Sequence, residues 1–141
     1  MAMSRDDETP RILTERLELV LLGRRFLASI VSGSPGSDPL FSDPHGFIAG
    51  AEDVVRLRLD QLEARPEIAP WLLRALVVRE TRVAVGFIGF HDAPDERGMT
   101  EIGYEVLPSF RRQGYAIEAV SALIGWAGRH GVSTVRACVD W

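Results

Sequence analysis

The first half of the chain holds one strand-like run followed by two helix-like runs. Residues 12–22, ILTERLELVLL, place apolar side chains at nearly every second position, which predicts a strand. Residues 24–31 are short and compatible with a helix, and residues 32–46 are dense in Gly, Pro, Ser and Asp, which predicts a loop. Residues 51–65 repeat apolar side chains with a helical period, and Pro66 follows them, so a second helix is expected there.

The second half begins with three strand-like runs. Residues 73–80 and 83–93 are rich in β-branched and aromatic side chains and only two residues separate them, which predicts a hairpin. Residues 99–107 follow a polar turn and extend this hairpin into a meander. Residues 115–130 carry apolar side chains along one helical stripe and are followed by a glycine, and residues 133–141 form a final β-branched run.

The predicted order is β–α–α–β–β–β–α–β, a mixed α/β (α+β) fold. A strand–helix–strand connection through short turns favours a right-handed crossover, so strands 99–107 and 133–141 should run parallel. At 141 residues the chain has the size of one domain, which we place at residues 11–141. Residues 1–10 are polar and end at a proline, so we expect a disordered leader there.

Composition limits the classes of function. The net charge of −4 gives no broad basic surface, so no nucleic-acid partner is expected. The single Cys138 excludes an internal disulfide framework, and its apolar strand favours a small buried residue. His45, His91 and His130 lie too far apart for a local zinc motif, so no metal is expected.

The N-terminal residues resemble no signal peptide, and the apolar runs are too short for a membrane span. The first twenty residues are acidic and polar, unlike a signal peptide. No apolar run approaches the ~20 residues that a transmembrane helix needs. We therefore expect a cytoplasmic protein without a membrane partner. The chain contains neither lysine nor asparagine, which points to a GC-rich bacterial genome.

The turn RRQGYA joins the strand 99–107 to the helix 115–130. The first N–H groups of a helix lack intrahelical partners, and together with the helix dipole they attract phosphate. Gly114 lets the backbone approach a ligand, Ala116 is small, and Arg111 and Arg112 add charge that can pair with phosphate. Junctions of this kind are also common without any ligand. The turn is neither a Walker P-loop nor a GxGxxG dinucleotide fingerprint.

Residues 111–116, RRQGYA, resemble the Gln/Arg-x-x-Gly-x-Gly/Ala signature of the GNAT superfamily of acyl-CoA-dependent N-acetyltransferases. The segments TERLELVLL, VGFIGFHDAP, TEIGYEVLPSFRRQGYAIEAVSALIGWA and GVSTVRACVD are similar to its RimJ/RimL-like branch, whose members acetylate protein N-termini. The resemblance spans residues 12–140 and is most specific over 83–140. It implies an acetyl-CoA-dependent N-acetyltransferase that moves an acetyl group to a primary amine by direct transfer.

The resemblance also implies where acetyl-CoA (coenzyme A) would bind. Its pantetheine arm would lie between the splayed parallel strands 100–107 and 133–140, and it would pair with the backbone of the first strand around a bulge, before Pro108 ends the ladder. The Val106 amide would donate to the thioester carbonyl and stabilise the oxyanion. The backbone and side chains implied in cofactor binding are those of Val106, Leu107, Arg111, Arg112, Gln113, Gly114, Tyr115 and Ala116, with Glu105 at the arm.

An attacking amine must lose a proton, and two carboxylates are candidate general bases. Alternation places Glu101 and Glu105 on one face of their strand and Tyr104 on the other. Either carboxylate can act as the base, through water, or can simply pair with arginines. His91 ends the neighbouring strand and can approach Glu101, although a histidine beside a turn is more often structural. Tyr104 and Tyr115 carry hydroxyls that could reach the leaving thiolate, but packing is the simpler role for Tyr104.

The chain departs from the family at its C-terminal end. Members normally add a turn, a helix and a final pair of strands after a segment like VRACVD, so the chain is C-terminally truncated relative to them. The group that protonates the leaving thiolate cannot be assigned. An unpaired strand 133–140 favours a homodimer through that edge.

A non-catalytic acyl-CoA-binding module, or a fragment of a longer acetyltransferase, is the alternative function. The acceptor, a protein N-terminus or a small-molecule amine, stays open, and we expect residues 32–46 and 51–65 to shape its pocket.

Overall fold

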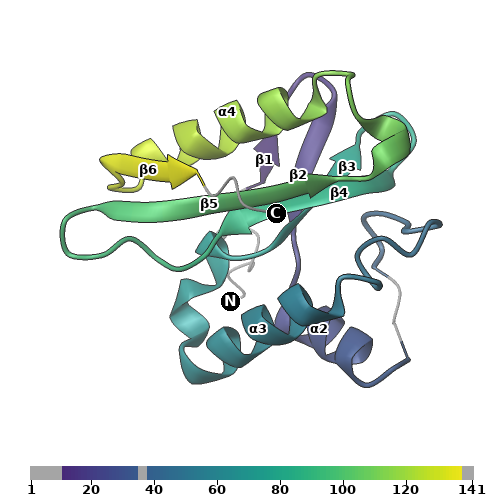
Figure 1. The fold of residues 1–141 in the computed structure, drawn as a ribbon, viewed down its shortest axis with the longest axis horizontal. Helices are drawn as coiled ribbons and strands as arrows, with labels where there is room; N and C mark the ends of the chain where they lie inside the picture. Colours follow the sequence, from purple (N-terminus) through teal and green to yellow (C-terminus); the bar gives the residue numbers. More distant parts are fainter. Residues whose placement is uncertain (1–10, 35–37, 138–141) are drawn as a thin grey trace, which may run out of the picture.

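A computed structural model describes residues 11–34 and 38–137 as a six-stranded sheet with helices on both faces (Figure 1). The strand order is β1-β2-β3-β4-β5-β6, with antiparallel pairing from β1 to β5 and parallel pairing between β5 and β6. The strands are β1 Ile12–Leu13, β2 Leu17–Leu21, β3 Arg74–Val78, β4 Val83–Phe90, β5 Met99–Val106 and β6 Thr134–Ala137. The mixed sheet and its parallel final pair agree with the fold class predicted from the sequence.

Among the described residues, three α-helices cover the sheet from opposite sides. Helix α4 (Tyr115–Gly128) lies on one face, while α2 (Arg24–Val31) and α3 (Glu52–Ala64) lie on the other (Figure 1). Each face has its own hydrophobic core, because successive side chains of a strand point to opposite sides. In β3, for example, Leu76 packs on the α4 side and Val77 packs on the α2–α3 side. The three predicted helices are thus present, each within two residues of its expected bounds.

The N-terminal strand predicted over residues 12–22 is wrong in one respect, because it is two short strands. The break falls at Thr14–Arg16, where the Thr14 N–H donates to Leu17 O at 2.8 Å and the Leu17 N–H donates to Thr14 Oγ1 at 2.8 Å. These bonds close a turn, and β1 folds back antiparallel to β2. The element order therefore gains one strand relative to the prediction. A 3₁₀ helix, Pro66–Trp71, also follows α3 where no regular element was expected.

The bulge expected in β5 is not there. The β4–β5 register is unbroken from the Phe90–Ile102 pair to the Gly86–Val106 pair. The register shift lies instead between β3 and β4, at Leu76 and Val77, so the extra residue belongs to β4. Pro108 does end the ladder as predicted, since a short 3₁₀ turn begins there, directly after Leu107 donates its N–H to Val85 O at 2.8 Å.

Some predictions fall on residues that the structure does not describe. The expected leader, residues 1–10, and Cys138 both lie outside the described residues. None of the helices in residues 11–34 and 38–137 has the length and apolar character needed to cross a bilayer. The same residues contain no group of three or more His, Cys, Asp or Glu side chains placed to hold a metal ion.

Candidate functional site

The turn between β5 and α4 has an unusual backbone. Gly114 is the N-cap residue of α4 and has a left-handed φ of 84°, and Arg112, two residues earlier, has a left-handed φ of 64°. Left-handed residues in such turns aim successive N–H groups into a concavity that binds anions. Glycine adopts this conformation without strain, whereas Arg112 adopts it at an energetic cost. The turn that was predicted to bind phosphate thus carries backbone strain at Arg112.

The first turn of α4 presents its backbone N–H groups without a side-chain cap. The first intrahelical bond runs from the Glu118 N–H to Gly114 O at 3.0 Å. The N–H groups of Tyr115, Ala116 and Ile117 consequently have no intrahelical acceptor. Three free donors at the positive end of a helix dipole can bind a phosphate oxygen.

Within the described residues, the C-terminal half of β5, residues 103–106, has one open edge, with which no described strand pairs. The His91 N–H donates to Glu101 O and the Leu107 N–H donates to Val85 O, both at 2.8 Å, so odd-numbered residues of β5 bond to β4. Even-numbered residues therefore direct their backbone groups to the other side. On that side the described part of β6 pairs only with Met99–Ile102, which leaves Tyr104 and Val106 facing an open edge. Among the predicted arm-binding residues, Val106 alone offers its N–H there, since those of Glu105 and Leu107 face β4.

One hollow of about 420 Å³ joins the turn, the helix start and the open edge. It brings together most of the predicted cofactor-binding residues, whereas Leu107 and Gln113 do not line it. Phe110 and Ile117 contribute apolar surface that the sequence analysis had not assigned to a site. The full lining is Tyr104, Glu105, Val106, Phe110, Arg111, Arg112, Gly114, Tyr115, Ala116 and Ile117.

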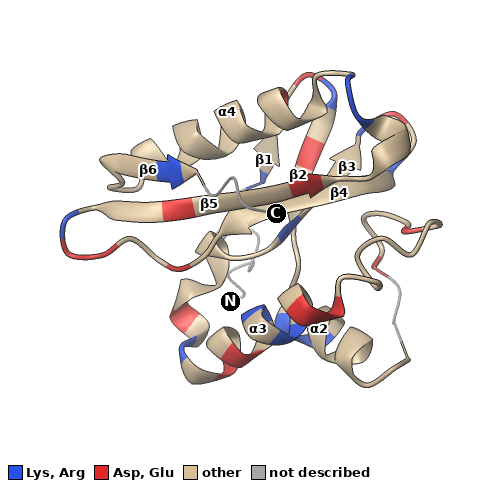
Figure 2. Ribbon diagram, in the orientation of Figure 1, with Lys and Arg blue, Asp and Glu red and all other residues tan. Residues whose placement is uncertain are grey.

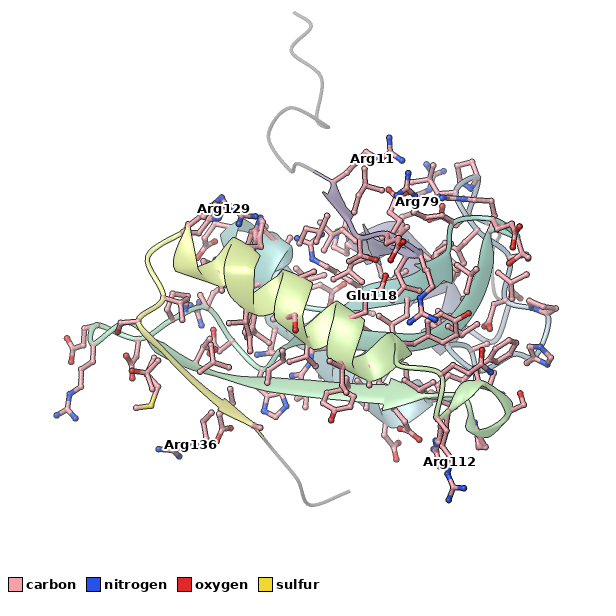
Figure 3. All side chains as sticks on the ribbon, turned by 90° about the horizontal axis from the view of Figure 1, so that it is seen from above. Arg11, Arg79, Arg112, Glu118, Arg129 and Arg136 are labelled. Carbon is pink, nitrogen blue, oxygen red and sulfur yellow. The ribbon has the colours of Figure 1, made fainter. Side chains whose placement is uncertain are left out.

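The turn contains two arginines, Arg111 and Arg112, which are drawn in blue in Figure 2. Their side chains are placed differently. Arg111 Nε donates to Val106 O at 2.8 Å, which fixes its guanidinium over the end of β5. The Arg112 side chain is directed away from the ribbon (Figure 3). Arg111 is consequently the better placed of the two to contact a phosphate in the hollow.

A third arginine beside the turn was missed by the sequence analysis. The Arg16 guanidinium lies 4.5 Å from the centroid of the Tyr115 ring, within cation–π range. Its Nη2 is 3.2 Å from the position that a Cβ on Gly114 would take. The contact joins segments that are far apart in the chain, so the sequence offers little sign of it. Its only local signal was the polar triplet Thr14-Glu15-Arg16, which interrupts the apolar run 12–22.

Glu118, in the first turn of α4, holds the β1–β2 turn against the helix start. Its carboxylate accepts hydrogen bonds from the Thr14 hydroxyl, from the Arg16 N–H at 2.8 Å and from Arg16 Nε at 2.7 Å. Burial alone would raise the pKa of Glu118, but these hydrogen bonds outweigh it and lower the pKa below its ordinary value. The ionised carboxylate is therefore the form that the fold stabilises.

The candidate general bases lie in different surroundings. Glu101 Oε1 is 3.3 Å from His91 Nδ1, and Glu101 Oε2 is 3.6 Å from an Arg136 guanidinium nitrogen. The predicted approach of His91 to Glu101 is thus confirmed, and so is the pairing of a carboxylate with an arginine. Glu105 lines the hollow beside Val106 and has no ion-pair partner within residues 11–34 and 38–137. Tyr104 packs into the core on the α4 side, as expected, but it also lines the hollow.

Comparison with known proteins agrees with this geometry. The model of the family described as an acetyltransferase (GNAT) domain matches residues 43–141. The chain belongs to the GNAT acetyltransferase family. A curated relative, the uncharacterized N-acetyltransferase YjdG of Bacillus subtilis, is 44% identical over 63 residues, which cover 44% of this chain and 38% of that protein. The chain therefore matches well under half of the length of this GNAT relative.

Two solved acetyltransferase structures share the fold. A putative ribosomal-protein-serine acetyltransferase from Vibrio cholerae has a TM-score of 0.59 at 24% identity, covering 92% of this chain and 74% of that one. RimL, a ribosomal L7/L12 α-N-protein acetyltransferase solved in complex with coenzyme A, has a TM-score of 0.51 at 18% identity, covering 86% and 69%. These two similarities support the overall fold of this chain.

Proposed function

We propose that this chain binds acetyl-CoA along β5 and the β5–α4 turn and transfers the acetyl group directly to a primary amine. One observation carries the proposal: the uncapped start of α4, the left-handed turn and the open edge of β5 line a single hollow. A ligand that has a pyrophosphate at one end and an extended amide-containing arm at the other fits these features in this order.

Each part of the hollow has a distinct task in this proposal. The free N–H groups at the start of α4 bind the pyrophosphate, and the Arg111 guanidinium adds a charge-assisted contact. The backbone of Tyr104 and Val106 pairs with the pantetheine arm as an added strand would. The Val106 N–H donates to the thioester carbonyl oxygen, where negative charge develops as the amine attacks.

The acceptor approaches from the face of the sheet under α3. Glu101, Gly103 and Glu105 lie on that face, at alternate positions of β5. A primary amine is the acceptor class, and both a protein N-terminus and a small-molecule amine satisfy it. The ribosomal-protein acetyltransferase named above shares the fold, so an N-terminal serine peptide is a suitable first probe.

The binding half of the proposal is tested by isothermal titration of this chain with acetyl-CoA. We expect micromolar binding, and we expect the Arg111→Ala/Arg112→Ala double variant to weaken it. A well-folded chain that shows no heat of binding would refute the assignment of the hollow.

The catalytic half is tested by thiol release from acetyl-CoA in the presence of primary amines. The panel holds short peptides with N-terminal serine or alanine, together with benzylamine and spermidine as small-molecule probes. Amine-dependent release of coenzyme A, with the acetylated product seen by mass spectrometry, supports transfer. Binding without release by any amine supports the alternative, a non-catalytic acyl-CoA-binding module or a piece of a longer acetyltransferase.

A further inference from the structure

Arg16 reaches the start of α4 from the turn between β1 and β2, residues 14–16, which lies beside that end of the helix (Figure 1). Its Nη2 is 3.2 Å from the position of a Cβ on Gly114, and its guanidinium carbon lies 4.5 Å from the centroid of the Tyr115 ring. Gly114 and Tyr115 both line the hollow at the β5–α4 turn, whereas Arg16 does not. The Arg16 guanidinium therefore borders the proposed acetyl-CoA site.

Two neighbours hold the Arg16 side chain in one orientation. The Glu118 carboxylate accepts a hydrogen bond from Arg16 Nε at 2.7 Å and another from the Arg16 N–H at 2.8 Å. The Tyr115 ring covers one face of the guanidinium. Because the side chain is already fixed, little conformational freedom is lost when it binds a further group.

The far edge of this guanidinium is open to a ligand. An arginine donates from Nε and from both Nη atoms, and Glu118 takes the donor on Nε. Within residues 11–34 and 38–137, Nη1 and Nη2 of Arg16 make no hydrogen bond. The side chain is 41% exposed, so a ligand can reach them. Planar pairs of N–H groups match two oxygens of a phosphate.

Acetyl-CoA carries a phosphate beyond its pyrophosphate, on the 3′ oxygen of the ribose. In the proposed function, on which this inference rests, the arm lies along β5 and the pyrophosphate lies at the free N–H groups of α4 beside Arg111. The rest of the cofactor then leaves the hollow at the start of α4, where the Arg16 guanidinium lies. The Arg112 side chain, in contrast, is directed away from the ribbon (Figure 3).

From this geometry we propose that Arg16 binds the 3′-phosphate of acetyl-CoA and that Glu118 positions it. A phosphate monoester carries about −1.5 to −2 charges at neutral pH, which favours a guanidinium as its partner. The Glu118 carboxylate would repel such a group, but it is engaged by Thr14 and by the other edge of the Arg16 guanidinium. Arg16 thereby makes the chain prefer coenzyme A to its 3′-dephospho form.

Isothermal titration with acetyl-CoA and with 3′-dephospho-acetyl-CoA measures this preference. The two probes have the same arm and the same pyrophosphate, so the ratio of their Kd values reports the 3′-phosphate alone. We expect the wild type to bind acetyl-CoA at least about tenfold more tightly, which is the effect of one charge-assisted contact. Arg16→Ala should bring this ratio close to unity and leave the Kd for the dephospho probe unchanged, which also shows that the hollow is intact.

Two further variants separate the contact from effects on folding and on net charge. Arg16→Gln removes the charge but keeps an amide donor for the Glu118 carboxylate, and it should lose the preference as Arg16→Ala does. Arg129→Ala removes one positive charge at the opposite end of α4 from Arg112 (Figure 3). At 1.5 Å per residue this helix is roughly 20 Å long, about twice the screening length at 0.1 M salt, so Arg129→Ala should keep the wild-type ratio.

Three results would overturn the assignment. Both Arg16 variants could keep the wild-type ratio, the wild type could bind the two probes equally, or Arg129→Ala could change the ratio as much as Arg16→Ala does. In each of these cases Arg16 does not bind the 3′-phosphate, while the hollow keeps its proposed function. A wild type that binds neither probe is a different outcome, because the proposed function then fails and the role of Arg16 fails with it.

Discussion

Gly114 has an unusual backbone conformation and also lines the hollow proposed to bind acetyl-CoA. Its left-handed φ of 84° is unfavourable for any residue with a Cβ, and Arg16 Nη2 already occupies the space beside it. We expect Gly114→Ala to lower the free energy of unfolding by about 1–2 kcal/mol. Misalignment of the α4 N–H groups should also raise the Kd for acetyl-CoA about tenfold. Thermal denaturation and isothermal titration measure the two effects.

The matched control lies at the other end of the same helix. Gly128 is helical, and apart from its chain neighbours and the backbone of its own helix, no described atom lies within 4 Å of the position that its Cβ would take. Gly128→Ala should therefore stabilise the protein by about 0.5–1 kcal/mol and leave acetyl-CoA binding unchanged. Equal effects at both positions would contradict a special role for Gly114.

Arg111 and Arg112 give a second prediction at the residue scale. Arg111 is held over the end of β5 by its bond to Val106 O, whereas Arg112 is directed outward (Figure 3). We expect Arg111→Ala to weaken acetyl-CoA binding by at least about tenfold, the loss of one charge-assisted contact. Arg112→Ala should weaken acetyl-CoA binding only about threefold at low salt, which is the effect expected from the loss of an exposed charge. Equal losses in titrations of the two variants would show that only the net charge of the turn matters.

At the scale of elements, Glu118 joins α4 to the β1–β2 turn. Glu118→Gln keeps the size of the side chain but removes its charge, so we expect the free energy of unfolding at neutral pH to fall by about 1–3 kcal/mol. Because the pKa of Glu118 is lowered in the folded state from 4.5, its contribution is present above that value and is lost as the pH falls through the folded pKa. The difference between wild type and variant should therefore vanish at low pH.

Urea denaturation at several pH values from 7 to about 3 measures this difference. Glu52→Gln is the control, since Glu52 forms an exposed pair with Arg56 at 2.8 Å and should change stability by less than about 0.5 kcal/mol. A wild-type advantage over Glu118→Gln that stays constant down to pH 3 would contradict the linkage.

The elements of this fold were largely predictable, because hydrophobic period, glycine and proline act locally. The helix that became α4 and the strand that became β5 both follow from their own residues, and so does the turn between them. The Arg16–Glu118 contact was not predictable, since it joins residues 102 positions apart. The left-handed Arg112 was not either, because arginine has no local preference for that conformation. The split of β1 from β2 depends on the Thr14 hydroxyl, which caps the turn between them. This turn was missed because the apolar side chains on both sides of it alternate as they would in one continuous strand.

At the scale of the molecule, the sheet has one exposed parallel edge in its described part. Strand β6 pairs with β5 on one side, and its described residues have no strand on the other side. Three of them, Thr134, Arg136 and Ala137, are exposed. Unpaired edges of this kind form pairs with other chains, so the homodimer predicted from the sequence stays our prediction.

Light scattering coupled to size-exclusion chromatography tests this dimer. We expect a mass that rises with protein concentration toward twice 15.6 kDa. Ala137→Lys should favour the monomer, because a lysine on an edge strand opposes pairing between chains. Ser121→Lys adds the same charge on the exposed surface of α4 and should leave the mass unchanged. A monomeric mass for the wild type up to high concentration would contradict the prediction.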